Sequence, residues 1–239
     1  GSERNNSASG QIDVESQEIE EYPALQATQA PEAAAEILRA HWGIGNNSIK
    51  NLIALLESKG IRVYSLAIDA KEVDAFSMWS GGRPFMFLNT FKSAERCRFD
   101  AAHELGHLVL HQHGHPQGID VEREANAFAS AFLMPRASVL ARAPRSATIK
   151  SLIKFKKYWS VSVAALNYRL HSLGLISDWT YRTLCIQIAQ EGFRTSEPEA
   201  IAHEKSLILE KVFSALREEG LSKNNVADQL AIPTTEINE

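Results

Sequence analysis

The chain has 239 residues, of which 44% are hydrophobic and 23% charged, and its formal net charge is -4. These values are ordinary for a globular protein with one large or two small domains, and no run approaches the roughly 20 apolar residues of a membrane span. Two cysteines, Cys97 and Cys185, are too few for a disulfide framework. We therefore expect a cytoplasmic location and no membrane partner.

The N-terminal part changes character near residue 30. Residues 1–30 are polar and acidic and lack an apolar period, which predicts a disordered arm. From Pro31 onward, apolar residues recur at helical spacing. We expect one helix from there to Trp42, closed by glycines, and a second helix that Ser48 caps and that ends before Gly60.

Three short segments then alternate in the manner of strands, at 61–68, 75–79 and 84–89, with a Gly-Gly turn between the last two. A small sheet therefore precedes the next helix, which Ser93 is placed to cap. Residues 95–99 form either the first turns of that helix or a segment leading into it.

The next helix carries the pattern H-E-x-x-H in His103, Glu104 and His107. Side chains four residues apart lie on one helix face, so the two imidazoles can bind a single ion. Neutral imidazoles suit Zn²⁺, and a catalytic zinc site has three protein ligands and one position for water. A neighbouring carboxylate can then serve as the general base. The alternative is an amphipathic helix that carries two histidines by chance.

A third ligand is expected from a second helix, predicted at 121–133 and ending before Pro135. Glu122 lies in its first turn, and Asn126, one turn on, can hydrogen-bond a ligating imidazole. Glu124 is rotated about 200° from Glu122 around the helix. We choose Glu122 as the ligand, while a plain helix N-terminal acid remains the alternative.

A second arrangement would take the third ligand from the motif helix itself, with His113 as that ligand. It requires a glycine where Leu110 stands, so we disfavour it. His111 and His115 are expected either to be solvated or to hydrogen-bond a metal ligand without binding the metal themselves.

Two longer runs, RCRFDAAHELGHLVLH and EREANAFASAFLMP, together with LRAHWGIG, LLESKGIRV and AFSMW, resemble the ImmA/IrrE family of zinc metallopeptidases over about residues 30–200. The resemblance implies a gluzincin-like site with one Zn²⁺ bound by His103, His107 and Glu122, and with Glu104 as the general base. It also implies a substrate class, because members typically cleave a helix-turn-helix repressor.

Cys97, six residues before His103, suggests a further hypothesis. A thiolate in the fourth zinc position would displace water and give a latent enzyme. Six residues is not an in-phase helical spacing, so a small buried residue is the simpler interpretation.

The segment 125–177 contains lysines and arginines but no acidic residue, and aromatic residues are interleaved with the cations. This pattern is typical of surfaces that bind single-stranded nucleic acid. The candidate contacts are Arg145, Lys150, Lys154, Lys156 and Lys157. The alternative is a helical core with a solvated lysine face.

We therefore expect an α+β fold. A zincin-like peptidase core with a small sheet occupies 31–140, followed by an all-α region with a basic helical bundle at 141–200 and a helix-turn-helix-like tail at 201–239.

The predicted function is zinc-dependent, site-specific cleavage of a helix-turn-helix repressor, which relieves repression in a stress, DNA-damage or phage-defence response, with single-stranded DNA as a possible activator. The alternative is a DNA-binding regulator whose zinc site is structural or sensory.

Overall fold

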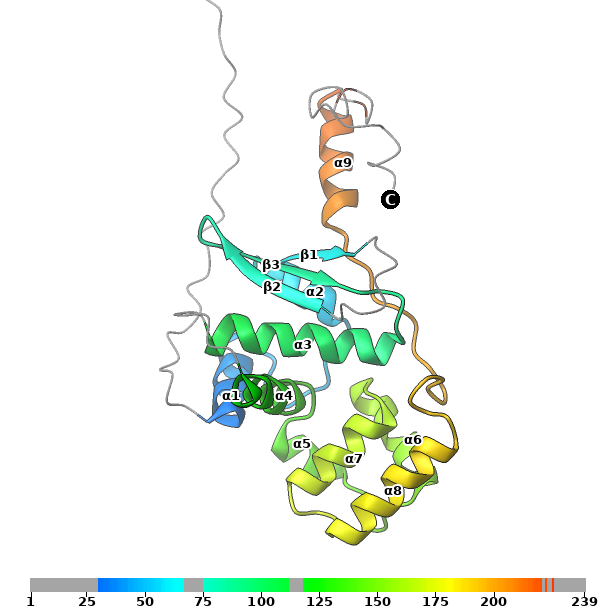
Figure 1. Cartoon of the computed structure of the whole chain (residues 1–239). Helices are drawn as coiled ribbons and strands as arrows, with labels where there is room; N and C mark the ends of the chain where they lie inside the picture. Colours follow the sequence, from blue (N-terminus) through cyan, green and yellow to red (C-terminus); the bar gives the residue numbers. More distant parts are fainter. Residues whose placement is uncertain (1–29, 67–74, 112–117, 221, 223–224, 226–239) are drawn as a thin grey trace, which may run out of the picture.

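The computed structural model describes residues 30–66, 75–111, 118–220, 222 and 225. The elements, in chain order, are α1 (Pro31–His41), α2 (Leu52–Ser58), β1 (Arg62–Ser65), β2 (Ala75–Ser80), β3 (Arg83–Leu88), α3 (Ala94–Leu110), α4 (Ile119–Leu133), α5 (Arg136–Arg142), α6 (Ile149–Trp159), α7 (Val163–Ser172), α8 (Asp178–Gln190) and α9 (Ile208–Glu218). The fold is α+β, as predicted. Helix α3 runs beneath the sheet, α1 and α4 lie on the other side of α3, and α5 to α8 form a helical group at one end (Figure 1).

The sheet has the strand order β1-β3-β2, with β1 parallel and β2 antiparallel to β3. The turn between β2 and β3 is made by Gly81 and Gly82, whose φ values of 57° and 73° belong to the left-handed region. Glycine adopts that region without steric cost, which is why the Gly-Gly pair marks the hairpin. Strand β1 covers part of the segment predicted at 61–68, and residues 67–74 lie outside the described ranges.

The N-terminus of α2 differs from the prediction. Asn51, rather than Ser48, caps the helix, because its side chain accepts a hydrogen bond of 2.9 Å from the backbone N–H of Ala54. The N–H groups of Leu52 and Ile53, which lie between Asn51 and Ala54, donate to the carboxylate of Glu204 at 2.8 and 3.0 Å. A residue about 150 positions away in sequence therefore completes the cap, which no local pattern could indicate.

Helix α3 begins where the sequence predicted. The Ser93 hydroxyl accepts a hydrogen bond of 3.2 Å from the backbone N–H of Arg96, and the helix continues without a break to Leu110. Residues 95–99 are therefore its first turns and not a segment leading into it.

The buried apolar side chains form one cluster that extends from α1 to α8. Trp159 of α6, Leu170 of α7 and Ile188 of α8 belong to the same cluster as Phe132 of α4. The position chosen as a domain boundary, near 140, lies in α5, inside this continuous core.

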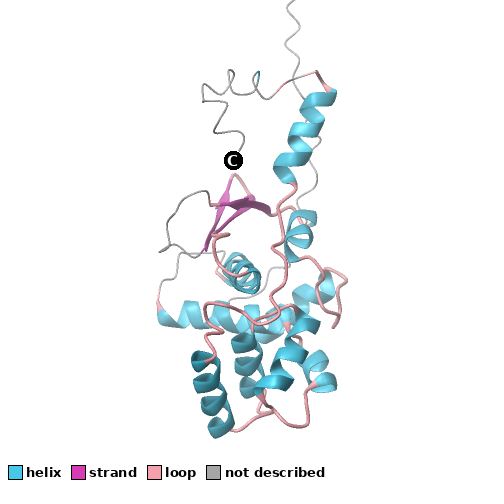
Figure 2. Cartoon of the chain, turned by 90° about the vertical axis from the view of Figure 1, so that its right-hand side faces the viewer, coloured by secondary structure: helices cyan, strands magenta, loops and turns pink. Residues whose placement is uncertain are grey.

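After α8 the chain runs back past α3 and α2 toward α9 (Figure 2). Ile201 N–H donates to Glu95, Glu204 binds the start of α2, and Ser206 donates to Glu57. The segment 201–207 is therefore an extended strap that ends at α9 and is not helical. Most of the helix-turn-helix pattern predicted in the tail, at 221–237, lies outside the described residues.

The prediction that Lys156 contacts nucleic acid is wrong, because its side chain is 1% exposed. Its ammonium group lies 2.9 Å from Glu95 and 3.3 Å from Glu197, which are also buried. The basic residues around it suggested an exposed position, but the ion pair with Glu95 joins this lysine of α6 to α3. Lys157 is exposed and pairs with Glu199.

The other three candidate contacts, Arg145, Lys150 and Lys154, are exposed, so binding of nucleic acid by them stays a prediction. Of the described helices, none is both long and apolar enough to cross a bilayer.

We predict that Lys156→Ala lowers the free energy of unfolding by about 3–5 kcal/mol, because it leaves two buried carboxylates without their cation. Urea denaturation followed by circular dichroism measures this change. Lys154→Ala, on the exposed side of the same helix, should cost less than about 0.5 kcal/mol. Equal effects of the two substitutions would contradict the buried ion cluster.

Candidate metal centre

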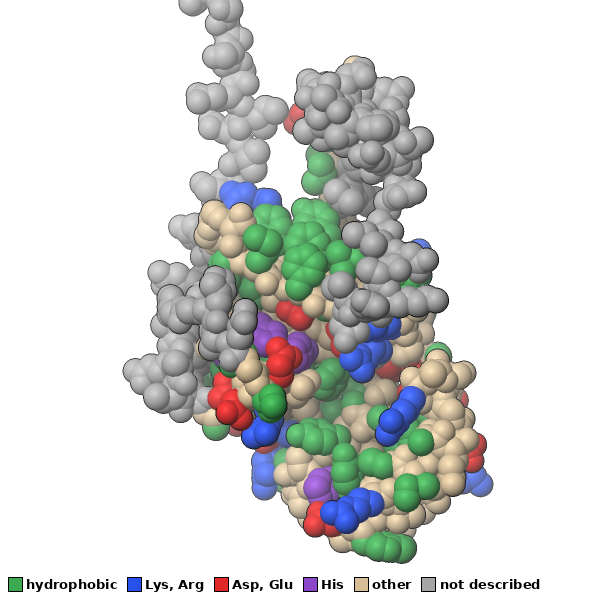
Figure 3. All heavy atoms as spheres, viewed as in Figure 1, with side chains coloured by type: hydrophobic (Ala, Val, Ile, Leu, Met, Phe, Trp, Pro, Cys, Tyr) green, Lys and Arg blue, Asp and Glu red, His purple; other side chains and the backbone are tan. Residues whose placement is uncertain are grey.

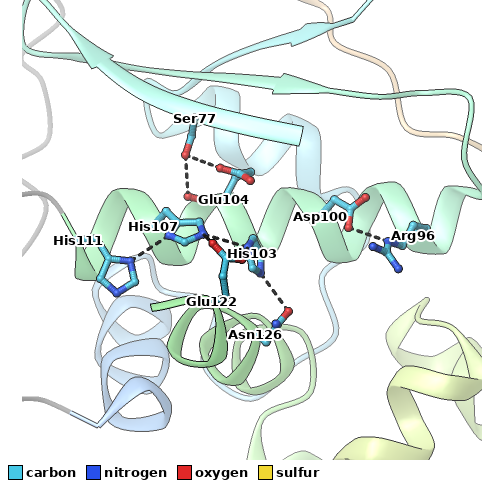
Figure 4. Close-up of polar contacts among 9 residues, drawn as sticks. All are labelled: Ser77, Arg96, Asp100, His103, Glu104, His107, His111, Glu122 and Asn126. Atoms are coloured by element: carbon cyan, nitrogen blue, oxygen red, sulfur yellow. Dashed lines mark hydrogen bonds and ion pairs between the residues drawn. The ribbon is translucent and has the colours of Figure 1, made fainter. Parts of the chain in front are cut away.

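Two helices bring three potential metal ligands together (Figure 4). His103 and His107 project from α3, and Glu122 projects from the first turn of α4. The Nε2 atoms of the histidines are 3.0 Å apart, and the Glu122 carboxylate lies 3.2 Å from His103 Nε2 and 3.5 Å from His107 Nε2. Within the described residues, these are the side chains whose ligand atoms cluster within 4.8 Å of one another.

The hydrogen bond of His103 determines which of its nitrogens faces the cluster. Its Nδ1 lies 3.0 Å from the amide oxygen of Asn126, and an oxygen can only accept, so we assign the proton to Nδ1. The lone pair is then on Nε2, which points toward His107 and Glu122. Asn126 thus lies where the sequence placed it, one turn beyond Glu122.

A second chain of hydrogen bonds orients His107. Its Nδ1 lies 3.0 Å from Nδ1 of His111, and the Nε2 of His111 lies 3.1 Å from the carboxylate of Glu124. If the carboxylate accepts from Nε2–H of His111, then Nδ1 of His111 accepts from Nδ1–H of His107. The remaining lone pair of His107 is again on Nε2, facing the cluster.

The sequence prediction left the contacts of His111 open and gave Glu124 no role. The hydrogen bond between His111 and Glu124 joins α3 to α4, so only the packing of the two helices reveals it.

The residues present fit a metal ion. Two imidazole lone pairs and a carboxylate converge with no donor hydrogen between them, an arrangement that a cation relieves. Burial, followed by the proximity of His103, lowers the pKa of His107 to about 4, so its imidazole is neutral and in the form that binds metals. Ligands of a tetrahedral zinc ion at 2.0–2.1 Å lie roughly 3.4 Å from one another, close to the separations observed here.

Glu104 lies next to this cluster but does not join it. Its carboxylate accepts a hydrogen bond of 2.6 Å from Ser77 of β2, whose hydroxyl is also 3.3 Å from the backbone oxygen of Glu104. Burial raises the pKa of Glu104, and the bond from Ser77 opposes that shift. The sequence prediction missed Ser77, although it stands in the AFSMW run.

The close approach of α3 and α4 depends on Gly106. A Cβ atom at this position would lie 3.3 Å from the Cα and the oxygen of Ala125, and 3.2 Å from the Phe128 ring. These are tighter contacts than a Cβ atom ordinarily makes, so a side chain at this position requires Ala125 and Phe128 to move by a few tenths of an ångström. Since the ligands come from both helices, Gly106 controls the distance between them.

The cluster opens into a cavity of about 510 Å³ between α3, α4 and the start of β2. Its lining includes the three potential ligands, Glu104, Asp100 and Ala75. A water molecule and a peptide group therefore have room beside the cluster.

Cys97 is not part of the cluster, which corrects the hypothesis of an inhibitory thiolate. The thiol lies 3.3 Å from the backbone oxygen of Asn89 and 3.8 Å from that of Lys92. Burial, and then the charge of Asp100, raise the pKa of Cys97 to about 11, so the thiol keeps its proton. Because α3 already begins at Ala94, Cys97 is rotated about 120° from His103 and lies about 9 Å away along the axis.

The comparison with protein families agrees with this geometry. Residues 56–171 match the family model Peptidase_M78, described as the IrrE N-terminal-like domain. This part of the chain belongs to that metallopeptidase family. The Peptidase_M78 match includes β1 to β3, both helices of the cluster and most of α7. A search of curated proteins found no match for the chain.

The alternative third ligand, His113, and its neighbour His115 lie outside the described residues.

We predict that Gly106→Ala weakens metal binding, because the added methyl group separates Glu122 from the histidines. The helix itself gains up to about 1 kcal/mol of intrinsic propensity from this change, so stability of the metal-free protein should change little. Competition with a zinc chelator measures affinity, and thermal unfolding in EDTA measures stability. Unchanged affinity would show that the helix separation does not control the cluster.

We also predict that His111→Ala and Asn126→Ala each reduce zinc affinity by about 10- to 100-fold, because each frees one imidazole to rotate. His171→Ala, which removes an imidazole on α7 that is not part of the cluster, is the matched control. Equal affinity in all three variants would contradict the orienting chains.

Proposed function

We propose that this protein is a zinc-dependent endopeptidase with a zincin-like catalytic core, and that its substrate is a helix-turn-helix repressor. The observation that carries the proposal is the convergence of His103, His107 and Glu122 beside the buried carboxylate of Glu104, in one cavity. Three ligands and an adjacent carboxylate constitute a hydrolytic site, whereas a structural zinc is enclosed by four ligands. This distinction disfavours the alternative of a regulator with a structural zinc.

His103, His107 and Glu122 would hold the ion, with their two imidazoles fixed by Asn126 and His111. Zinc bound there supplies Lewis acidity, which lowers the pKa of water and polarises a carbonyl oxygen. The neutral imidazole of His107 and the carboxylate of Glu122 supply electron pairs to such an ion.

Glu104 is the proposed general base. It accepts a proton from the attacking water and passes it to the leaving amine as the peptide bond breaks. Burial raises its pKa and so increases its affinity for that proton. The hydrogen bond from Ser77 holds one carboxylate oxygen, Oε2, which fixes the direction of the group, and we assign proton transfer to Oε1.

Strand β2 is positioned to orient a substrate. Among the described strands it pairs with β3 alone, and Ala75 at its start lines the cavity. An exposed strand edge offers backbone groups that pair with an extended peptide. A segment of the repressor bound along β2 would therefore bring a peptide group to the cluster.

The substrate class rests on the family resemblance, since members typically cleave repressors. Cytoplasmic location and activation by single-stranded DNA remain predictions of the same proposal. The basic residues that stay exposed, such as Arg145 and Lys150, support only the latter.

The test is cleavage of purified helix-turn-helix repressors, beginning with any that is encoded beside the gene of this protein. We expect Glu104→Gln to lower the cleavage rate by about 100- to 10,000-fold while zinc content stays at one ion per chain. Glu36→Gln, an exposed change on α1, should leave the rate unchanged. Gel electrophoresis and mass spectrometry follow the product, with and without single-stranded DNA.

Cleavage that survives Glu104→Gln would refute the assigned base. No cleavage by the zinc-loaded protein under either condition would favour a regulatory role for the metal.

A further inference from the structure

A second, larger cavity continues from the metal centre toward the helical group. Its volume is about 1420 Å³, above the roughly 300–1,000 Å³ of small-molecule sites. Arg96, Phe99, Glu122 and Asn126 line both cavities, so the two are continuous. In Figure 3 the face that bears the histidines is hollowed where the upper layers meet the lower helices.

The two walls of this groove come from distant parts of the chain. One wall is formed by the segment before α3 and by the first turns of α3 and α4. The other is formed by α7, α8 and the loop after α8. Because the groove continues into the cavity of the metal ligands, it has room for the residues on one side of the scissile bond of a polypeptide cut at the cluster.

The apolar part of the lining is unusually exposed. Phe91 is 70% exposed, Ile119 is 78% exposed and Tyr168 is 42% exposed, and all three line the groove. Large apolar side chains in contact with water favour a ligand that covers them. We therefore expect the bound segment to place an apolar side chain against these three residues.

The charged part of the lining is mostly basic. Four cations, Lys92, Arg96, Arg123 and Arg194, line the groove. Lys92 and Arg96 already pair with Asp100, at 3.9 and 2.9 Å, and Arg123 forms an exposed pair with Asp120 at 3.2 Å. The two acidic groups are engaged elsewhere: Glu122 faces the histidines, and Glu197 is buried against Lys156 while it accepts from Val163 N–H. A bound segment with acidic side chains would complement Arg194 and would compete with the exposed Asp120 for Arg123, because a surface ion pair of this kind is weak.

We propose that this groove is the recognition cleft for the cleaved polypeptide and that it selects a segment in which a large apolar side chain is flanked by acidic residues. The inference rests on the proposed peptidase function and adds to it the substrate sequence class. Arg123 and Arg194 are its specificity-determining residues, because both are exposed at the groove and neither contacts the metal ligands in the described structure.

The test measures binding without cleavage. The zinc-loaded Glu104→Gln protein is titrated with short fluorescein-labelled peptides in which a central leucine is flanked by glutamates or, in the matched peptide, by lysines. Fluorescence anisotropy should show roughly tenfold tighter binding of the glutamate peptide at low salt, with the difference reduced at high salt.

Charge reversal identifies the residues responsible. Adding Arg123→Glu and Arg194→Glu should invert the preference between the two peptides. Arg182→Glu, an exposed change on α8 outside the groove, should leave it unaltered. Ile119→Asn should weaken the glutamate peptide severalfold and abolish its advantage over a version with alanine in place of leucine. Equal binding of both peptides, or a preference that charge reversal does not change, would overturn the proposal that this groove selects acidic segments.

Failure of the cleft and failure of the peptidase are distinguishable. A charge preference in binding, together with no cleavage of repressor or peptide by the protein that retains Glu104, would support recognition by the groove and contradict the proposed peptidase function. Cleavage of the repressor without any charge preference in binding would support the peptidase function and contradict recognition by the groove.

Discussion

The contact between α3 and α4 at Gly106 is the constraint on which the metal cluster depends. A single helix can present two histidines one turn apart, but it cannot supply the third ligand without unwinding. Here the third ligand comes from α4, and the absence of a side chain at Gly106 lets Ala125 and Phe128 approach to contact distance. The separation of the ligands is therefore set by packing, which changes little in a closely packed interior.

Metal binding and helix packing should then stabilise each other. Without a cation, the lone pairs of His103 and His107 and the charge of Glu122 oppose the approach of the two helices. With a cation bound, the same atoms hold the helices together, and ligand binding to the folded state adds to its stability. The orienting bonds from Asn126 and Glu124 both start on α4, so that helix provides a ligand and also the support for the ligands on α3.

The position of α3 is in turn fixed by buried polar links to remote parts of the chain. Arg98 donates to the backbone oxygen of Ile49 at 2.8 Å and also pairs with Glu204 of the strap. Glu95 binds Lys156 and the N–H of Ile201. The pair between Glu95 and Lys156 joins the helical group to the first turn of α3, and the bonds to Glu204 and Ile201 fasten the strap to the same end of α3.

The success and failure of the sequence predictions follow from the range of the interactions involved. The i, i+4 spacing of His103 and His107 and the glycines of the hairpin are local features, so the sequence indicated the motif helix and the turn. Glu122 was inferred from helix phase and from the family resemblance. Ser77 could not be found in this way, because its role requires the sheet to lie over α3.

Charged residues were harder to interpret. Lys156 was predicted to contact nucleic acid because basic and aromatic residues surround it in sequence, but its ammonium group is buried against two carboxylates from distant segments. Cys97 looked like a possible ligand while the start of α3 was undefined, and the cap at Ser93 removed that freedom. In each case, a contact distant in sequence decided what a local pattern left open.

X-ray absorption spectroscopy at the zinc edge tests the central claim most directly, because it reports the ligand atoms of the bound ion. The structure predicts one zinc per chain, a shell of nitrogen and oxygen ligands at about 2.0–2.1 Å with imidazole scattering, and no sulfur. His107→Ala should remove part of the imidazole signal. A sulfur ligand at about 2.3 Å, or a zinc site unaffected by the loss of His107, would contradict the two-helix site.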